Sequence, residues 1–473
     1  MDTKKLRQKI LDLAIRGKLV PQDPNDEPAS VLLERIRAEK EQLIKEGKIK
    51  RSKKSAASDT SHYENYELPQ GWTYATMGDI CIKIVDGDHN PPIAQKTESK
   101  YIMISSKNVI NNSITHLDDV RYLSKADFEL SNARTQVSKG DVLFTSMASL
   151  GRTCIYDLDY PITFQRSVTV ICTKIFNKYL KLFLDSPIYQ NYVVENARGT
   201  AQKGFYINQI SDSWVPIPPL NEQIRIVEKA QSLLDVVQII EYSKEEISNN
   251  ILALKSKILD LAISGKLVRQ VKSDEPAIEL LKRINAQYQP TDNRHYENVP
   301  KGWCFAKIKD IFIINPKNKA NDYDMAGFVS MSMINEGYVD SYQYESREWS
   351  SIKAGFTHFQ DGDIAVAKIS PCLENRKSMI LKGLPNGIGA GTTELHVFRS
   401  SIVDARYALY FFKSDYFIAQ CIGTFNGVVG QQRVGKSVIE DIVFPLPPLE
   451  EQRRIVCTIS VIFKHLDNIL SEL

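Results

Sequence analysis

LRQKILDLAIRGKLVPQDPNDEPASVLLERIRAEK, at residues 6–40, returns later in the chain as LKSKILDLAISGKLVRQVKSDEPAIELLKRINAQY, at residues 254–288. The two stretches share 22 identities in 35 positions without a gap, whereas about 2 are expected for unrelated sequences of average composition. In each copy a glycine, Gly17 or Gly265, stands where a helix should stop. The D-E-P-A segment that follows begins a second helix, because proline fits a first helical turn. The sequence therefore predicts an internal duplication.

Two shorter motifs are also repeated and border the long segments between the helices. LPQGWTYATMGDI at 68–80 resembles VPKGWCFAKIKDI at 299–311, and we call this the opening motif. VPIPPLNEQIRIV at 215–227 matches FPLPPLEEQRRIV at 444–456 in 9 of 13 positions, and we call this the closing motif. The order is therefore helix, insert, helix, followed by a second helix, insert, helix.

The two inserts, roughly 81–214 and 312–443, share little beyond Gly140-Asp141-Val142 and Gly362-Asp363-Ile364. A constant frame around two divergent inserts indicates one scaffold that carries two specificities. Short apolar runs bounded by Gly, Asn, Asp or Pro predict strands, and two longer stretches predict helices. The expected strands are 101–105, 141–146, 168–173, 363–369 and 394–399, and the expected helices are 177–196 and 402–421.

Apolar residues at alternating steps of four and three indicate that the frame forms coiled-coil helices. The alternative is that these helices are core helices of a larger domain. The expected seam consists of Leu6, Ile10, Leu13, Ile224, Val227, Leu234, Ile247, Ile251, Leu254, Ile258, Leu261, Ile459, Ile462, Leu466 and Ile469.

Composition excludes several classes of protein. No run of 18 apolar residues suggests a membrane span, and the charged N-terminus lacks the apolar region of a signal peptide. Seven scattered cysteines without a C-x-x-C pair indicate reduced thiols and a cytoplasmic location, not a disulfide framework or a zinc site. A net charge of +3 permits nucleic-acid binding without arguing for it.

Taken together, the opening motif, the closing motif and the I-L-D-L-A-I-x-G-K-L-V helix resemble the specificity subunit of type I restriction–modification systems over nearly the whole chain. The DGDHNPP stretch at 86–92 also resembles a D-G-x-H segment found in one class of that family's target-recognition domains. The second insert lacks this segment, so its class stays open.

The resemblance implies a mixed α/β (α+β) protein with two target-recognition domains separated by a long antiparallel coiled coil, with pseudo-twofold symmetry. Each domain would read one half of an asymmetric bipartite DNA target. The helices would space the domains and dock two methyltransferase subunits, and two restriction subunits would complete the complex. S-adenosylmethionine, ATP and Mg would be used by those other subunits, with no cofactor in this chain.

The expected domain boundaries follow the repeats. Residues 1–60 form an N-terminal helical region and linker, and 61–216 the first target-recognition domain. Residues 217–290 form the central helices, 291–445 the second domain, and 446–473 the C-terminal helix.

Candidate DNA contacts lie in loops that mix Arg or Lys with Asn, Gln, Ser or Thr, since these side chains read base edges or hold phosphates. In the first insert the candidates are Asp86, His89, Asn90, Ser105, Lys107, Asn108, Ser146, Arg152, Gln165, Arg166, Arg198, Thr200, Gln202, Lys203 and Tyr206. In the second insert they are Lys317, Lys319, Lys368, Asn375, Arg376, Lys377, Thr392, Thr424, Asn426, Gln431, Gln432 and Arg433.

Two other functions are weighed against DNA recognition. An adenine-N6 methyltransferase acting alone is disfavoured, because Asn90-Pro91-Pro92-Ile93 lacks the aromatic ring on which a flipped base stacks. There is also no convincing Gly-rich cofactor loop, and the histidines lack metal-ligand spacing. We therefore expect no catalytic, cofactor or metal residues in this chain. A coiled-coil adaptor without a DNA role is the remaining alternative.

Overall fold

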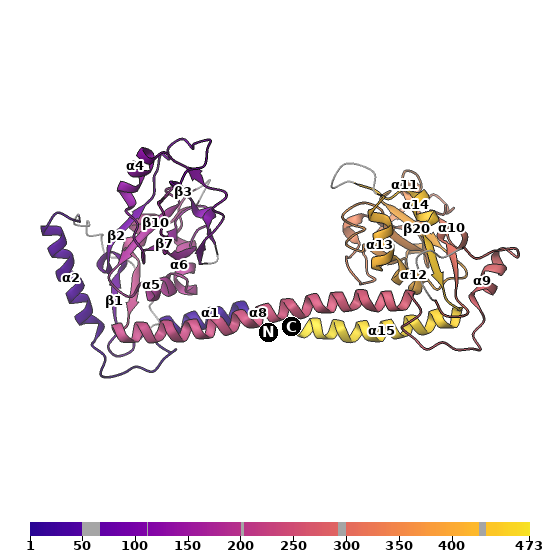
Figure 1. Ribbon diagram of the computed structural model, residues 1–473, viewed down its shortest axis with the longest axis horizontal. Helices are drawn as coiled ribbons and strands as arrows, with labels where there is room; N and C mark the ends of the chain where they lie inside the picture. Colours follow the sequence, from indigo (N-terminus) through magenta and orange to yellow (C-terminus); the bar gives the residue numbers. More distant parts are fainter. Residues whose placement is uncertain (50–66, 111, 200–202, 292–298, 425–431) are drawn as a thin grey trace. The chain divides into compact units, whose positions relative to one another are not determined.

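The computed structural model describes residues 1–49, 67–110, 112–199, 203–291, 299–424 and 432–473. The chain forms two compact units, Met1–Ser243 and Lys244–Leu473 (Figure 1). The boundary falls inside the helix α8 (Leu220–Ile263), so the expected central region 217–290 is divided between the units.

The first unit begins with α1 (Thr3–Ile15) and α2 (Ala29–Lys45), followed by the first insert. The insert and its borders contain the helices α3 (Met77–Ile80), α4 (Lys125–Thr135), α5 (Asn177–Leu184), α6 (Pro187–Asn196) and α7 (Ile207–Asp212). Its strands are β1 (Thr73–Thr76), β2 (Cys81–Asp86), β3 (Ile102–Ile104), β4 (Val109–Ile110), β5 (Ser113–Ile114), β6 (Arg121–Tyr122), β7 (Val142–Thr145), β8 (Thr153–Ile155), β9 (Ile162–Phe164), β10 (Val168–Thr173) and β11 (Trp214–Ile217).

The second unit repeats this plan, starting from the second half of α8. Its helices are α9 (Ala277–Ile284), α10 (Ile308–Ile311), α11 (Trp349–Ile352), α12 (Ala405–Phe412), α13 (Asp415–Ile422), α14 (Lys436–Asp441) and α15 (Leu449–Glu472). Its strands are β12 (Cys304–Lys307), β13 (Ile313–Ile314), β14 (Met325–Val329), β15 (Glu345–Glu348), β16 (Thr357–Gln360), β17 (Ile364–Ala367), β18 (Ser378–Ile380), β19 (Ile388–Gly391), β20 (Leu395–Arg399) and β21 (Val443–Leu446).

The two inserts share the strand order of their main sheet although their sequences diverge. The main sheet has the order β2-β10-β7-β8 in the first unit and β13-β20-β17-β18 in the second. A second sheet contains the parallel pair β3 and β9 in the first unit and the parallel pair β14 and β19 in the second. The mixed α/β class and the five expected strands are confirmed. Each expected insert helix is split in two, since Ser186 and Ser414 cap a new helix after a short break.

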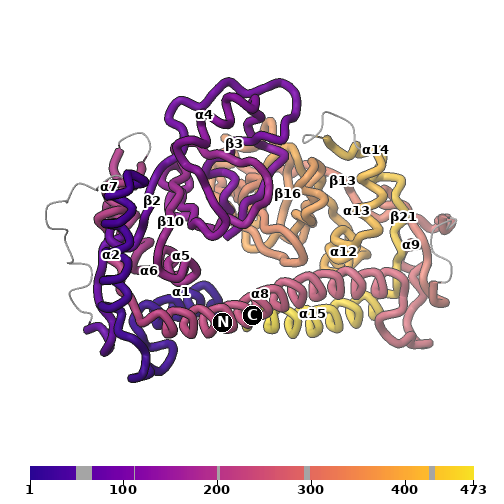
Figure 2. Tube along the Cα trace, turned by 60° about the vertical axis from the view of Figure 1, so that its left-hand side comes forward, coloured from indigo at the N-terminus to yellow at the C-terminus, as the bar shows by residue number. Residues whose placement is uncertain are grey.

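The frame helices pair antiparallel within each unit. In the first unit Arg7 of α1 forms an ion pair of 2.7 Å with Glu241 of α8. In the second, Lys255 of α8 pairs with Asp467 of α15, and α15 lies alongside this part of α8 (Figure 2). Arg7 and Lys255 occupy equivalent positions of the repeat, so the duplication extends to the ion pair between the helices.

These helices are also core helices of their own unit, so the coiled-coil expectation and its alternative are both partly right. Ile10 of α1, Phe144 of β7 and Ile226 of α8 belong to one apolar core. In the second unit Ile258 of α8 and Ile459 of α15 share a core with the insert. Each insert is therefore packed firmly onto its helices.

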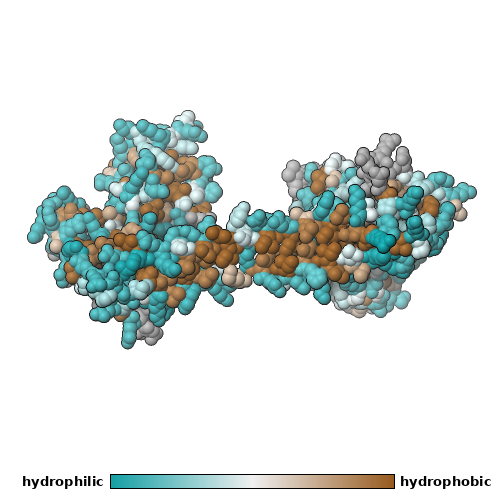
Figure 3. Space-filling model, turned by 60° about the horizontal axis from the view of Figure 1, so that its bottom comes forward, coloured by the Kyte–Doolittle hydropathy of each residue, from teal (hydrophilic) through white to brown (hydrophobic). Residues whose placement is uncertain are grey.

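Within this chain the expected coiled-coil and partner residues are only partly buried. Ile10, Ile251, Ile258, Ile459 and Leu466 are buried, and Leu6, Leu13, Val227, Leu234, Leu261 and Ile462 are half-buried. Ile224, Ile247, Leu254 and Ile469 are exposed instead, Leu254 at 46%. α8 packs against a helix and against an insert in each unit, so both neighbours determine which of its side chains are buried. Ile469 lies near the end of α15. Figure 3, which brings the helices forward, shows hydrophobic side chains gathered along them.

Candidate nucleic-acid interface

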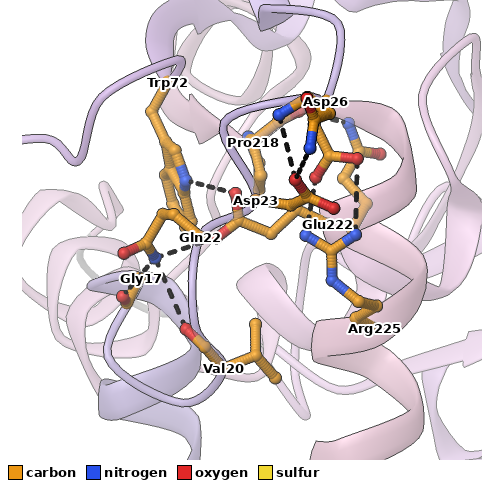
Figure 4. Close-up of polar contacts among 11 residues, drawn as sticks. Gly17, Val20, Gln22, Asp23, Asp26, Trp72, Pro218, Glu222 and Arg225 are labelled. Carbon is orange, nitrogen blue, oxygen red and sulfur yellow. Dashed lines mark hydrogen bonds and ion pairs between the residues drawn. The ribbon is translucent and has the colours of Figure 1, made fainter.

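In the first unit the three repeated motifs meet in a polar cluster that we call the clasp: Gln22, Asp26, Trp72, Glu222 and Arg225 (Figure 4). The buried carboxylate of Glu222 accepts a hydrogen bond from Gln22 Nε2 at 3.0 Å and one from Trp72 Nε1 at 3.0 Å. Arg225 forms an ion pair of 2.6 Å with Asp26. The loop after α1, the opening motif and the closing motif are therefore tied at one point.

The second unit has a corresponding clasp, formed by Gln270, Asp274, Trp303, Glu451 and Arg454, in which Nε1 of Trp303 makes no hydrogen bond within the described residues. Gln270 Nε2 donates to Glu451 Oε1 at 2.6 Å, and Arg454 pairs with Asp274. This duplicated cluster links the three repeated motifs, so part of the identity between the repeats has a shared structural role.

The electrostatics of the clasp follow from its burial. Removal from water raises the pKa of Glu222 and of Glu451. Hydrogen bonds from Gln22 and Trp72 oppose this shift at Glu222, and the hydrogen bond from Gln270 opposes it at Glu451. The guanidinium of Arg225 lowers the pKa of Asp26. Sequence reasoning missed these residues as a cluster. The available signal was the identity of Gln22 with Gln270, in a loop where the flanking residues differ.

A pair of glycines completes the clasp. Gly17 and Gly265 end their helices with φ of +63° and +70°, as the sequence predicts. A Cβ on Gly17 would lie 2.4 Å from Cγ of Pro69, and one on Gly265 would lie 2.4 Å from Cδ of Pro300. Glycine is therefore required here for close packing as well as for its backbone conformation.

Each insert is closed at its base by a two-stranded antiparallel ribbon, β1 with β11 and β12 with β21. Tyr179 in the first insert donates a hydrogen bond to the carbonyl of Pro216 at 2.7 Å, and Tyr407 donates to that of Pro445 at 2.9 Å. The closing motif thus also anchors α5 in the first insert and α12 in the second.

A pocket in the first insert brings together five candidates from four separate segments of the chain: Asp86, His89, Ser146, Arg166 and Tyr206. The remaining lining residues are Met147, Thr169, Ile207 and Asn208. Clustering of predicted DNA-contacting side chains around one hollow makes this pocket the candidate centre of the interface.

Asp86 organises one wall of the pocket. Its carboxylate pairs with Arg134 of α4, whose Nε also donates to the Asp86 carbonyl at 2.9 Å. Its second oxygen, Oδ2, lies 2.5 Å from Nε2 of His89. The neighbouring Asp88 accepts a hydrogen bond from Ser131 at 2.6 Å, so the loop that carries His89 is held on both sides.

The other candidates in the first insert lie outside this pocket. Asn90, Arg152, Arg198 and Lys203 are exposed, Ser105 and Gln165 are half-buried, and Lys107 forms an ion pair of 2.6 Å with Asp119. The expectation that Asn108 contacts DNA is wrong. Asn108 is 0% exposed, and its amide donates to the carbonyls of Thr115, His116 and Asp119, so it stabilises a turn.

In the second insert several of the candidate Arg and Lys side chains already form ion pairs with acidic residues. Arg433 forms an ion pair of 2.8 Å with Glu394, Arg376 pairs with Asp415, and Lys377 lies 3.6 Å from Glu336. The other described candidates divide by exposure: Lys317, Lys319, Asn375 and Thr424 are exposed, while Lys368, Thr392 and Gln432 are half-buried. Four candidates, Thr200, Gln202, Asn426 and Gln431, lie outside the described residues.

Among the residues that the structure describes, no group of three or more His, Cys, Asp or Glu side chains is arranged to hold a metal ion. Nor does any described helix combine the length and apolar character needed to cross a bilayer. The seven cysteines are unpaired thiols, and burial raises the pKa of Cys81, Cys154, Cys304 and Cys421 to about 12.

Comparison with known proteins gives a family. The sequence model of the type I restriction modification DNA specificity domain matches residues 69–249 and 300–473. Each match runs from an opening motif through an insert and a closing motif, so both copies of the duplicated unit are recognised separately.

Individual relatives agree with this match. The chain is 41% identical to the specificity subunit of the type I restriction enzyme EcoAI of Escherichia coli, over 43% of this chain and 38% of that protein. It is 41% identical to the EcoEI specificity subunit of Escherichia coli, over 44% of this chain and 38% of that protein. The chain thus spans about two-fifths of the length of these curated relatives. A chain of a solved type I R-M system has the same fold, with a TM-score of 0.58, 16% identity, and coverage of 86% of this chain and 94% of that one.

Proposed function

Because the chain belongs to the family of type I restriction modification DNA specificity domains, we propose that it is the sequence-specific DNA-binding subunit of a type I restriction–modification complex. Each insert is a target-recognition domain and reads one half of an asymmetric bipartite target. The observation that carries this proposal is the contrast between a duplicated clasp and two inserts that share the order of their main sheet but hardly any sequence. Two different half-sites follow from two different surfaces on one fold.

The frame helices are the proposed means of assembly and spacing. In the first unit Val236, Ile239 and Tyr242 of α8 are exposed, Ile239 at 64%. In the second unit Leu252 of α8 and Val461 of α15 are exposed. Monomeric proteins rarely expose apolar side chains in rows, so we propose that these faces bind two methyltransferase subunits. Since α8 passes from one unit into the other without a break, its length is proposed to set the spacer between the half-sites.

The chemistry of the complex is assigned to other subunits. Two methyltransferase and two restriction subunits are proposed to use S-adenosylmethionine, ATP and Mg, while this chain is non-catalytic and works in the cytoplasm. Its described residues are consistent with a reading role, since the candidate pocket contains hydrogen-bonding side chains and an arginine that can reach a base edge.

The decisive experiment maps modified bases in DNA treated with the complex of this chain and its methyltransferase partners. We expect a bipartite motif with two unlike halves and a constant unread spacer. Exchanging residues 81–214 for another insert should change one half only, and removing a heptad from α8 should change the spacer alone. Absence of any sequence preference would refute the proposal, and methylation by the isolated chain would refute its non-catalytic role.

A further inference from the structure

We propose that the pocket of the first insert binds the exocyclic amino group of one adenine or cytosine in the major groove, and that Nδ1 of His89 accepts its hydrogen bond. This inference rests on the proposed function, because it names a chemical group that the first target-recognition domain reads. The geometry that points to it is the chain of contacts from Arg134 through Asp86 to His89.

Asp86 fixes the position of the proton on the imidazole. Its carboxylate is paired with Arg134, so it acts as an acceptor toward both neighbours. Nε2 of His89, 2.5 Å from Asp86 Oδ2, therefore carries the hydrogen. In a neutral imidazole the other nitrogen then has a free lone pair, as in metal and catalytic sites where a carboxylate selects the tautomer.

Nδ1 of His89 is available to a ligand. The side chain is 52% exposed, and within the described part of the chain Nδ1 makes no hydrogen bond. The loop is fixed nonetheless, because Asp88 N donates to the Phe164 carbonyl at 2.8 Å and Asp88 Oδ2 is held by Ser131. An acceptor in a fixed place discriminates between base edges better than one on a mobile loop.

The chemistry of the major groove selects the partner. Adenine N6 and cytosine N4 are the donors there, whereas guanine and thymine present acceptors at the corresponding carbonyl oxygens. The pocket around His89 also contains Arg166 and Asn208, both exposed.

The test is a cycle between protein and DNA variants, using the full chain with its methyltransferase partners and its mapped target. At each position of the first half-site, adenine is replaced by purine or cytosine by 2-pyrimidinone, because both analogues lack the exocyclic amine. With the wild-type chain we expect one position at which the analogue weakens binding about 10-fold. With His89→Ala the analogue should make no difference at that position.

Asp86→Asn gives a reciprocal prediction. The oxygen of the new amide would still accept a hydrogen bond from Arg134, so its N–H would donate to Nε2 of His89. The imidazole hydrogen would then move to Nδ1, the tautomer change known from catalytic triads. His89 then presents a donor. We expect this variant to prefer the inverted base pair at the same position, since inversion places a carbonyl oxygen near the place of the amine.

Controls separate this inference from the proposed function. His116→Asn alters an exposed histidine of the same insert that lies outside the pocket, and it should behave as wild type. Normal recognition of the second half-site by a variant complex would show that the complex is intact. A wild-type complex without sequence preference would refute the proposed function. A clear first half-site whose sensitivity to every analogue survives His89→Ala would overturn the inference alone.

Discussion

Gly17 is the position at which one methyl group tests whether the clasp holds the first unit together. Its φ is +63°, and a Cβ there would lie 2.4 Å from Cγ of Pro69 and 3.0 Å from the Trp72 ring. The left-handed backbone costs an alanine about 1–2 kcal/mol, and overpacking adds about 1–3 kcal/mol. Gly17→Ala should therefore lower the free energy of unfolding of the first unit by about 2–5 kcal/mol.

Gly47 provides a matched control. It follows α2 with a φ of +70°, and nothing lies within 4 Å of a Cβ built there. Gly47→Ala therefore carries the backbone cost alone, about 1–2 kcal/mol. The difference between the two variants isolates the contact of Gly17 with Pro69, about 1–3 kcal/mol, which corresponds to roughly 5- to 150-fold in an equilibrium constant.

Hydrogen–deuterium exchange of the full chain measures the difference in stability between the two variants separately for each unit. A single melting curve of a protein with two units does not separate them. Amides of α1, β1 and β11 should exchange faster in Gly17→Ala than in Gly47→Ala, while peptides of the second unit serve as reference. Equal exchange in the two variants would refute the idea that the clasp carries this stability. Gly265→Ala should give the mirror result in the second unit.

Three further predictions concern pH and assembly. Burial raises the pKa of Glu222. The contribution of this group to the free energy of unfolding is therefore present below pH 4.5, its ordinary pKa, and is lost as pH rises through its pKa in the folded protein. Glu222→Gln should flatten the pH dependence of stability, measured by urea denaturation, over this range. Arg225 lowers the pKa of Asp26, so this ion pair stabilises the fold above pH 3.8 and its contribution is lost as pH falls further. Asp26→Asn should remove this loss of stability at acid pH. An unchanged fall in the free energy of unfolding below pH 3.8 would contradict the prediction. Ile239→Glu should weaken methyltransferase binding at least about 10-fold in calorimetry, whereas Gln238→Glu, with the same charge change, should not; equal effects would argue against an apolar docking face.

Local patterns predicted the elements of the fold well. The run DIAVAKI became β17, and the stops at Gly17 and Gly265 became helix ends. These features depend on residues near one another in the chain, so periodicity and turn chemistry reveal them. The shared topology of the inserts was not predicted, because apolar side chains can satisfy the same strand positions with almost no identity.

The features that sequence patterns did not predict depend on contacts between residues far apart in the chain. Glu222 looks like an ordinary polar residue near the start of a helix, yet its partners Trp72 and Gln22 lie 150 and 200 positions away. Leu254 fits a heptad but is exposed, since the packing of α8 against a second surface rotates the buried face. The pocket residues, in contrast, were proposed one by one, and only the fold brings Asp86, Ser146 and Tyr206 together.

The ribbons that close the inserts have a consequence for evolution. Thr76 stands opposite Trp214 in the first ribbon, and Lys307 opposite Val443 in the second. Each insert thus leaves and rejoins the frame at adjacent points, and every clasp residue is encoded outside it. Recombination between genes with crossovers in the opening and closing motifs would replace a whole insert while keeping the ribbon and clasp. On the proposed function, a lineage would acquire a new half-site in one genetic event and retain its existing partners.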